Sequence, residues 1–349
     1  MQQRINAFVK LGSFLSQFSQ SGIEEKENIE FNELFFDGFK HQIKIAQENN
    51  SWFTKENILF SLESWSNALT KENISKWLDG QNFNSKKSTV AIIMAGNIPL
   101  VGFHDFLAVL ISGHSVLVKQ SSNDKNLLPF LAKYLEYVEP SIKGQIQFTE
   151  EKLENFDAVI ATGSNNTARY FEHYFKGKPN IIRKNRNSVA IITGNESEEE
   201  MNALSNDVFQ YFGLGCRSVS KLFVPNGYNF DAFFNGMYSQ KEIINNAKYA
   251  NNYDYNKAVY LMSEFDLLEN GFLMIKEDES YASPIATVFY EYYSDSNQLK
   301  EKLTNDADKI QCIVSKDFND QEIEFGQTQH PQLWDYADGV NTLDFLAKI

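Results

Sequence analysis

Two hydrophobic patterns divide the chain near residue 88. Before it, the sequence is polar and aromatic, and apolar residues such as Phe35, Phe36, Phe39 and Ile43 follow helical spacing. After it, short apolar runs alternate with longer amphipathic stretches. The predicted strands are 89–94, 115–119, 145–148 and 157–162, and the predicted helices are 103–112, 127–138 and 164–175. Apolar strands that alternate with helices indicate a parallel sheet covered on both faces, with a nucleotide site at the carboxyl ends of its strands.

A second α/β segment begins at residue 188. Its predicted strands are 188–193, 220–225, 282–293 and 312–315, and its helix, 197–212, starts with a capping box made of Ser197 and Glu200. We therefore predict an α/β protein with three parts. Residues 1–187 form a helical N-terminal layer and a Rossmann-type domain, residues 188–320 form a second α/β domain, and residues 321–349 return to the first domain or reach a partner subunit.

Composition excludes several classes of protein. A formal net charge of −14 over 349 residues argues against nucleic acid or an anionic membrane as a partner, because phosphate binding needs a basic surface. Two cysteines imply no disulfide framework. No apolar run approaches the roughly 20 residues that span a bilayer, and the start lacks the apolar core of a signal peptide. The histidines show no metal-ligand spacing, so we predict no metal site and expect a soluble cytoplasmic protein.

Cys216 is the candidate nucleophile. It lies in YFGLGCRSVSKLFVP, between a predicted helix and a predicted strand, and Gly213 and Gly215 allow the backbone to turn tightly beside it. Backbone amides in such a turn can lower the pKa of a thiol and so favour the reactive thiolate. The alternative is a small buried apolar residue, which many cysteines are. Cys312, within the apolar strand IQCIVS, fits that alternative.

Polar residues at the strand ends of the first domain are candidates for the rest of the site. Asn97 follows the first strand in AGNIPL, where a carboxamide can donate a hydrogen bond to an oxyanion, although Asn-rich turns are common. Lys119 ends the next strand and is followed by Ser121 and Ser122. A lysine there can reach the ribose or phosphate of a nucleotide, or it is an ordinary solvated strand end.

A glycine and a serine stand at the junction of another strand and helix. Gly163 and Ser164 lie in ATGSNNTARYF, so the helix that follows offers its N-terminal amides to a pyrophosphate. The usual GxGxxG pattern is absent. The junction by itself is therefore a weak indication of a dinucleotide site.

Taken in order, these motifs resemble those of the aldehyde dehydrogenase superfamily. AGNIPL, LISGHSVLVKQSS, DAVIATGS and FGLGCRSVSKLFVP look most like the LuxC-type acyl-CoA reductases, and the ending FGQTQHPQLWDYADGVNTLDFL is similar to the C-terminal segment of that family. The resemblance covers residues 88–349. It implies an aldehyde dehydrogenase-like fold in which a nicotinamide-binding domain is joined to a catalytic domain.

The resemblance also implies roles for the candidate residues. Cys216 is the nucleophile that carries the acyl group, and Asn97 together with the backbone amide of Cys216 forms the oxyanion hole. Lys119 holds the cofactor ribose, while Gly163 and Ser164 pack under the pyrophosphate and nicotinamide. The implied substrate is acyl-CoA or another acyl thioester, which the enzyme reduces to an aldehyde.

One departure from the superfamily favours reduction. Its oxidative members carry a glutamate, in a Glu-Leu-Gly-Gly segment, that activates water to hydrolyse the thioester. Here the corresponding stretch is IIRKNRNSVAII, which contains Arg183, Lys184 and Arg186 and no acid. Three alternatives stay open: an acyl phosphate as the donor, an acyl group delivered by a carrier or partner protein, and a non-catalytic subunit. The sequence also leaves open a homo-oligomer.

The loop after Lys119 predicts NADPH as the preferred cofactor over NADH. The superfamily often has an acid three residues after this lysine, where it bonds the ribose 2′-hydroxyl and repels a 2′-phosphate. Ser122 occupies that place here, and Lys119 and Lys125 supply positive charge. Asp124 is the one acid nearby that a shift of the loop could bring to the ribose.

Overall fold

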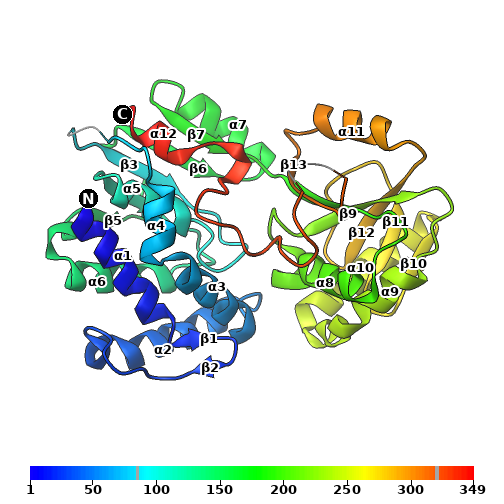
Figure 1. The fold of residues 1–349 in the computed structure, drawn as a ribbon, viewed down its shortest axis with the longest axis horizontal. Helices are drawn as coiled ribbons and strands as arrows, with labels where there is room; N and C mark the ends of the chain where they lie inside the picture. The colour runs from blue at the N-terminus through cyan, green and yellow to red at the C-terminus, as the bar shows by residue number, and fades with distance from the viewer. Residues whose placement is uncertain (84–85, 319–321) are drawn as a thin grey trace. The chain divides into compact units, whose positions relative to one another are not determined.

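The chain forms two compact units. A computed structural model describes residues 1–83, 86–318 and 322–349. Residues 1–184 and 332–349 make the first unit, and residues 185–331 make the second (Figure 1). The sequence placed the first boundary after residue 187 and the start of the C-terminal segment at residue 321. In the structure, the chain leaves the first unit after Lys184 and re-enters it at Gln332.

A five-stranded parallel sheet lies at the centre of the first unit. Its strands are β3 (Thr89–Ile93), β4 (Ser115–Lys119), β5 (Ile146–Phe148), β6 (Ala158–Thr162) and β7 (Asn180–Arg183), and their order is β5-β4-β3-β6-β7. Its connecting helices are α5 (Phe103–Ile111), α6 (Leu127–Val138) and α7 (Asn165–Tyr174). The strand order reverses between β3 and β6, and ligands of such sheets bind at the carboxyl ends beside the reversal. The predicted α/β fold class is confirmed.

The N-terminal layer shares its core with this sheet domain. It contains α1 (Gln2–Leu15), α2 (Asn32–Asn49), α3 (Lys55–Ala68), α4 (Lys71–Trp77) and a two-stranded ribbon of β1 (Phe18–Ser19) and β2 (Gly22–Ile23). Phe14 of α1 stacks on Tyr134 of α6 at 4.4 Å between ring centroids, and Phe35 of α2 meets the same tyrosine edge-on. The aromatic residues of the layer therefore bury the outer face of α6.

The C-terminal segment of the first unit closes onto α5. It contains a short 3₁₀ turn, η4 (Ala337–Gly339), and the helix α12 (Thr342–Leu346), which packs on α5 (Figure 1, red). The backbone carbonyl of Leu346 contacts Nε2 of His114 at 3.0 Å, and that of Leu333 contacts Nε2 of His104 at 2.8 Å. Burial lowers the pKa of both histidines, which favours their neutral forms.

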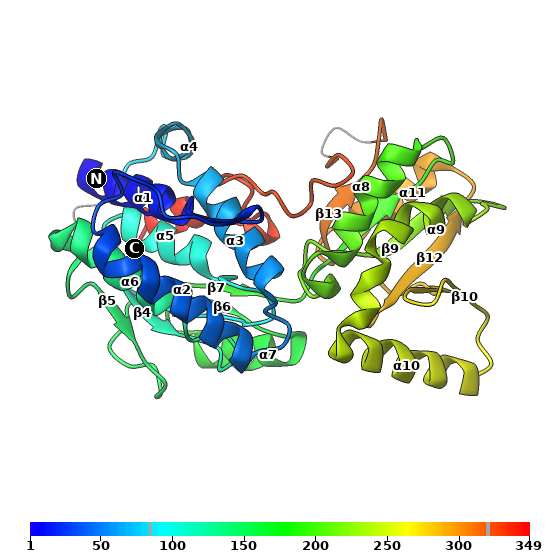
Figure 2. The same cartoon turned by 90° about the horizontal axis from the view of Figure 1, so that it is seen from below.

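A six-stranded sheet forms the second unit (Figure 2). Its strands are β8 (Asn187–Ile191), β9 (Val219–Pro225), β10 (Leu267–Glu269), β11 (Met274–Glu277), β12 (Thr287–Tyr293) and β13 (Ile310–Val314), in the order β10-β11-β12-β9-β8-β13. All neighbours are parallel except β10 and β11. The helices are α8 (Glu198–Phe209), α9 (Asp231–Met237), α10 (Ala247–Met262) and α11 (Ser296–Asn305).

Two elements of the second unit differ from the prediction. The predicted helix 197–212 begins with the expected capping box but ends at Phe209, because Tyr211 and Phe212 adopt left-handed conformations. The predicted strand 282–293 begins only at Thr287. Pro284 precedes that start, and a proline cannot donate to the ladder of a sheet. In the described parts of the chain, no helix combines the length and hydropathy needed to cross a membrane.

Candidate active site

The Asn97 turn and the Lys119 loop lie side by side at the carboxyl edge of the first sheet. Asn97 follows β3, and Lys119 ends its neighbour β4 in parallel register. A Cβ on Gly96 would lie only 2.5 Å from the Oγ of Ser121, so the turn packs against the loop through a position that only glycine can occupy. Asn97 itself is exposed. The structure therefore brings Asn97, Lys119 and Ser121 to one edge.

Asp124 holds the end of the Asn97 turn. Its buried carboxylate accepts a hydrogen bond from the backbone N–H of Leu100 at 2.9 Å. Leu100 has a φ of 58°, which is a left-handed conformation that a leucine rarely adopts. Burial raises the pKa of Asp124 to about 6, although the Leu100 N–H acts in the opposite direction. The sequence pattern left Asp124 as a possible contact to the ribose, whereas its carboxylate is turned to the backbone of the neighbouring turn.

In the loop after β4, the side chain of Ser122 is exposed to solvent. The Nζ of Lys119 donates to the carbonyl of Glu151 at 2.8 Å, and Lys125 forms an ion pair with Glu150 at 2.5 Å. The positive charge of Lys125 is therefore partly neutralised, and Lys119 is the cation next to the serines.

Gly163 and Ser164 form the start of α7, beside β6. The Oγ of Ser164 caps the helix by accepting the N–H of Thr167 at 3.3 Å. A Cβ on Gly163 would lie 3.0 Å from the Cβ of Thr167 and 3.1 Å from the ring of Phe171, so glycine permits the close approach of strand and helix. Since β6 pairs with β3, this helix N-terminus opens at the same carboxyl edge as the Asn97 turn.

Cys216 lies in the second unit, in an exposed turn before β9. Three successive residues ahead of it, Tyr211, Phe212 and Gly213, have φ values of 56°, 58° and 73°. Such conformations cost non-glycine residues on the order of 1–2 kcal/mol each and concentrate at functional sites. The Oγ of Ser188 donates to the carbonyl of Cys216 at 3.0 Å. Cys312, in contrast, is buried within β13.

Two buried residues beside this turn are absent from the predicted site. Asp207 of α8 accepts the N–H of Gly326 at 2.6 Å, and the N–H and Oγ1 of Thr328 at 2.9 and 2.8 Å. The carbonyl of Thr328 accepts from the Nε of Arg217, the residue after Cys216. The one signal in the sequence is the FGQTQHP motif, because nothing local distinguishes Asp207 from the other polar residues of its helix.

The basic residues at the junction of the two units, Arg183, Lys184 and Arg186, have structural roles. Arg183 is buried and pairs with both carboxylate oxygens of Asp105 at 2.8 Å, and it also donates to Thr342 at 3.1 Å. Lys184 pairs with Glu172 at 2.7 Å. Arg186 donates to the carbonyl of Ala307 at 3.1 Å. The three basic residues therefore connect separate elements through ion pairs and hydrogen bonds.

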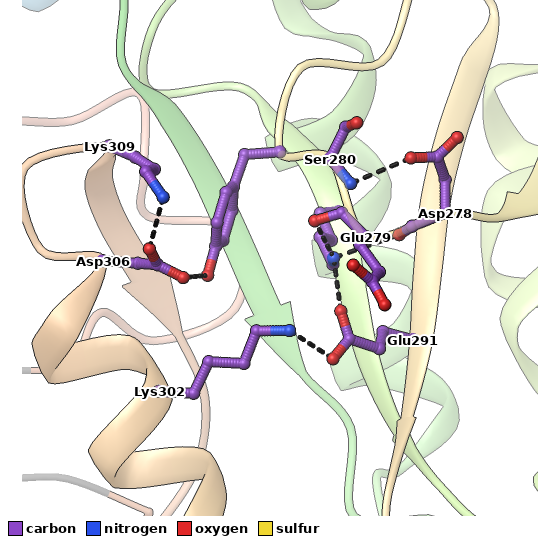
Figure 3. A network of polar contacts seen from close by, with 9 residues as sticks. Asp278, Glu279, Ser280, Glu291, Lys302, Asp306 and Lys309 are labelled. Atoms are coloured by element: carbon purple, nitrogen blue, oxygen red, sulfur yellow. Dashed lines mark hydrogen bonds and ion pairs between the residues drawn. The ribbon is translucent and has the colours of Figure 1, made fainter.

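A second polar network, in the second unit, links the sheet to α11 and to residues 278–280 (Figure 3). The Nζ of the fully buried Lys221 donates to the carbonyls of Asp278 and Glu279 at 3.0 and 2.8 Å, and to Glu291 at 2.7 Å. Glu291 also pairs with Lys302 of α11. Burial lowers the pKa of Lys221, whereas the bond to Glu291 opposes that shift. None of the predicted site residues belongs to this network, which ties β9, β12 and α11 together.

Comparison with known proteins identifies the class of fold. Aldehyde dehydrogenase 21 from Physcomitrella patens is 14% identical over 90% of this chain and 73% of its own, with a TM-score of 0.63. An NAD-dependent benzaldehyde dehydrogenase from Corynebacterium glutamicum is 13% identical over 92% and 79% of the two chains, with a TM-score of 0.66. The chain thus has the aldehyde dehydrogenase fold.

A family model narrows this class. The model of the acyl-CoA reductase family LuxC matches residues 38–240, which is more than half of the chain. The chain belongs to the LuxC family of acyl-CoA reductases. It is therefore an oxidoreductase that acts on aldehyde or acyl groups. The resemblance inferred from the motifs is confirmed. No curated protein matches the sequence significantly.

Proposed function

We propose that the protein reduces an acyl-CoA thioester to an aldehyde, with Cys216 as the nucleophile and a reduced nicotinamide dinucleotide as the hydride donor. The observation that carries the proposal is the setting of Cys216 in a chain of the LuxC family. Its side chain is exposed in a turn that follows three left-handed residues, whereas Cys312 is buried in a strand. Exposure and nearby backbone N–H groups are the conditions under which a thiolate reacts.

The first unit has features that suit a dinucleotide. The N-terminus of α7 and the close packing at Gly163 offer a helix end without an intervening side chain, which suits a pyrophosphate. Lys119 and Ser122 stand at the end of β4, where a ribose of such a cofactor binds in sheets of this kind. We assign Lys119, Ser121, Ser122, Gly163 and Ser164 to this cofactor, with NADPH preferred over NADH.

The residues of the chain then have separate roles. The Cys216 thiolate attacks the carbonyl carbon of the thioester, and the new C–S bond is made as coenzyme A leaves as a thiolate. Asn97 donates a hydrogen bond to the oxyanion that develops on the carbonyl oxygen. The bound cofactor supplies the hydride that brings the acyl group to the aldehyde level. Cys216 departs as a thiolate when the aldehyde carbonyl forms, and is then ready for another cycle.

The basic stretch supports reduction rather than hydrolysis. Arg183, Lys184 and Arg186 are engaged in ion pairs and hydrogen bonds, and no acid stands among them to activate water. An acyl group on Cys216 would consequently persist until hydride transfer.

The test compares the two cysteines. We expect Cys216→Ala to abolish turnover, because it removes the nucleophile, and Cys312→Ala to retain most of it. Cofactor absorbance should be followed with acyl-CoA, acyl-carrier-protein and acyl-phosphate donors in parallel, so that the donor class is identified at the same time. Mass spectrometry of protein incubated with the donor alone should show an acyl adduct on Cys216. An adduct on Cys312, or full activity of Cys216→Ala, would refute the proposal.

A further inference from the structure

Residues 325–331, the FGQTQHP segment, have no part in the proposed reaction, although the motif is similar to the family's C-terminal segment. In the structure this segment belongs to the same unit as Cys216. Phe325 is buried, as are Thr328 and Gln329. A segment without a helix or strand of its own is normally exposed and variable in position, so its burial needs a cause.

Asp207 of α8 explains why one side of the segment is buried. Its side chain is 0% exposed and its carboxylate is fully used by three donors from Gly326 and Thr328. Gly326 has a φ of 83°, and a Cβ there would lie 3.1 Å from Ala203 of the same helix. A buried carboxylate is costly unless hydrogen bonds compensate for its lost hydration. Asp207 therefore anchors the segment to α8.

The segment contacts the nucleophile turn on its other side. The Nε of Arg217 donates to the carbonyl of Thr328, and the Nε2 of Gln329 donates to the Oγ of Ser218 at 3.3 Å. Arg217 and Ser218 are the two residues that follow Cys216. Thr328 thus donates two hydrogen bonds to Asp207, from its N–H and its hydroxyl, and its carbonyl accepts one from Arg217 of the turn.

The turn has a physical need for such support. Tyr211, Phe212 and Gly213 occupy left-handed conformations ahead of Cys216. Conformations of this kind persist only where surrounding contacts hold them. Within the turn, the N–H of Ser218 donates to the carbonyl of Gly215 at 3.0 Å, and the carbonyl of Cys216 accepts from the Oγ of Ser188 at 3.0 Å.

We propose that Asp207 and Thr328 are positioning residues that hold the Cys216 turn in its reactive conformation through Arg217. The inference rests on the proposed function only in taking Cys216 as the nucleophile. On this view the FGQTQHP motif connects the rigid helix α8 to the turn that carries the thiol.

The test removes one hydroxyl. Thr328→Val keeps the shape of the side chain and the backbone bond to Asp207 but loses the hydroxyl's bond to that carboxylate, and Thr328→Ser keeps both bonds. Hydrogen exchange of the peptide 210–219 should be about tenfold faster in Thr328→Val and near the wild-type rate in Thr328→Ser. Turnover should fall about tenfold in kcat with KM changed by less than about twofold, because the change affects the reacting group rather than substrate binding.

Thr342→Val is the matched control. Thr342 is also fully buried and hydrogen-bonded to a charged side chain, that of Arg183, but it belongs to the first unit. We expect it to leave the exchange of 210–219 at the wild-type rate. Arg217→Met breaks the other end of the same connection, and it decides the matter if Thr328→Val does not fold.

The outcomes separate this inference from the proposed function. Unchanged exchange of 210–219 in Thr328→Val and Arg217→Met overturns the inference, and so does faster exchange with unchanged kcat. A wild-type protein that turns over no acyl donor refutes the proposed function instead, and the exchange measurement still decides whether the connection holds the turn.

Discussion

At the scale of single residues, Asp124 makes a pH-dependent contribution to the stability of the fold. Its carboxylate is buried and its pKa is raised from 3.8 to about 6, mainly by desolvation. The folded protein therefore favours the protonated form, so the contribution of Asp124 to stability is fully present below about pH 4 and is lost as the pH rises through 6. A shift of this size corresponds to roughly 3 kcal/mol.

Replacing Asp124 by Asn should remove this pH dependence. An asparagine keeps an acceptor for the Leu100 N–H and does not titrate. Urea unfolding at pH 4 and pH 7 should show the wild type losing on the order of 3 kcal/mol relative to Asp124→Asn between the two values. Asp157→Asn is the control, because Asp157 is exposed and accepts the N–H of Thr89 at the opposite end of β3. Equal pH slopes for the wild type and Asp124→Asn would contradict the prediction.

The proposed preference for NADPH is tested at Ser122, at the same scale. We expect the wild type to have the higher kcat/KM with NADPH, and Ser122→Glu to shift the ratio toward NADH, since a carboxylate there would bond a 2′-hydroxyl and repel a 2′-phosphate. Ser141→Glu adds the same charge in an exposed 3₁₀ turn before the amino end of β5 and should leave the ratio unchanged. A wild type that prefers NADH, or a ratio that Ser122→Glu does not move, would show that this loop does not read the 2′ position.

At the scale of elements, the buried ion pair of Arg183 and Asp105, together with Thr342, connects β7, α5 and α12. Arg183 ends β7, Asp105 lies in the first turn of α5 and Thr342 begins α12. Both charges are almost fully removed from water, with exposed side-chain fractions of 9% and 2%. A buried pair is weak evidence for net stabilisation, but a single buried charge left without its partner is costly.

Breaking this pair should cost more than breaking an exposed one. Asp105→Asn and Arg183→Met should each lower the free energy of unfolding by about 3–5 kcal/mol, and the double replacement should recover part of the loss. Glu172→Gln is the control, because its pair with Lys184 is half exposed and should contribute less than about 1 kcal/mol. Thermal and urea unfolding measure both. A loss for Asp105→Asn no larger than that for Glu172→Gln would argue against a structural role of the pair.

At the scale of the whole molecule, the chain divides its proposed functions between two sheets. The proposed cofactor residues lie at the carboxyl edge of the first sheet, and the proposed nucleophile precedes β9 of the second. The chain passes between the units at 184/185 and at 331/332, so the FGQTQHP segment belongs with Cys216 and the residues after it belong with α5. The motif and the tail that follows it thus have different surroundings although they are adjacent in the sequence.

Local features of the sequence were sufficient for many of the elements and for naming the candidate residues. Periodicity located β3, β4, β5 and β6 and the helices α5, α6 and α7 that connect the first sheet, because the spacing of apolar side chains reflects one buried face, but it did not locate β7, β10 or β11. Ser197 and Glu200 marked the start of α8, since a capping box is made by residues three apart. The Gly-flanked Cys216 and the ends of β3, β4 and β6 were likewise visible as turns after apolar runs.

Only the tertiary structure decided which residues, far apart in the sequence, come into contact. Asp207 and Thr328 are 121 residues apart, Arg183 and Asp105 are 78 apart, and Asp124 reaches a backbone N–H 24 residues away. The left-handed turn at Tyr211 and Phe212 overrode a helical pattern that continued through it. Such contacts depend on how separate elements pack, and on the cost of burying a charge, neither of which leaves a periodic signal in the chain. The sequence alone therefore determined many of the elements, the family and the candidate reactive residues, whereas long-range packing determined what holds them in place.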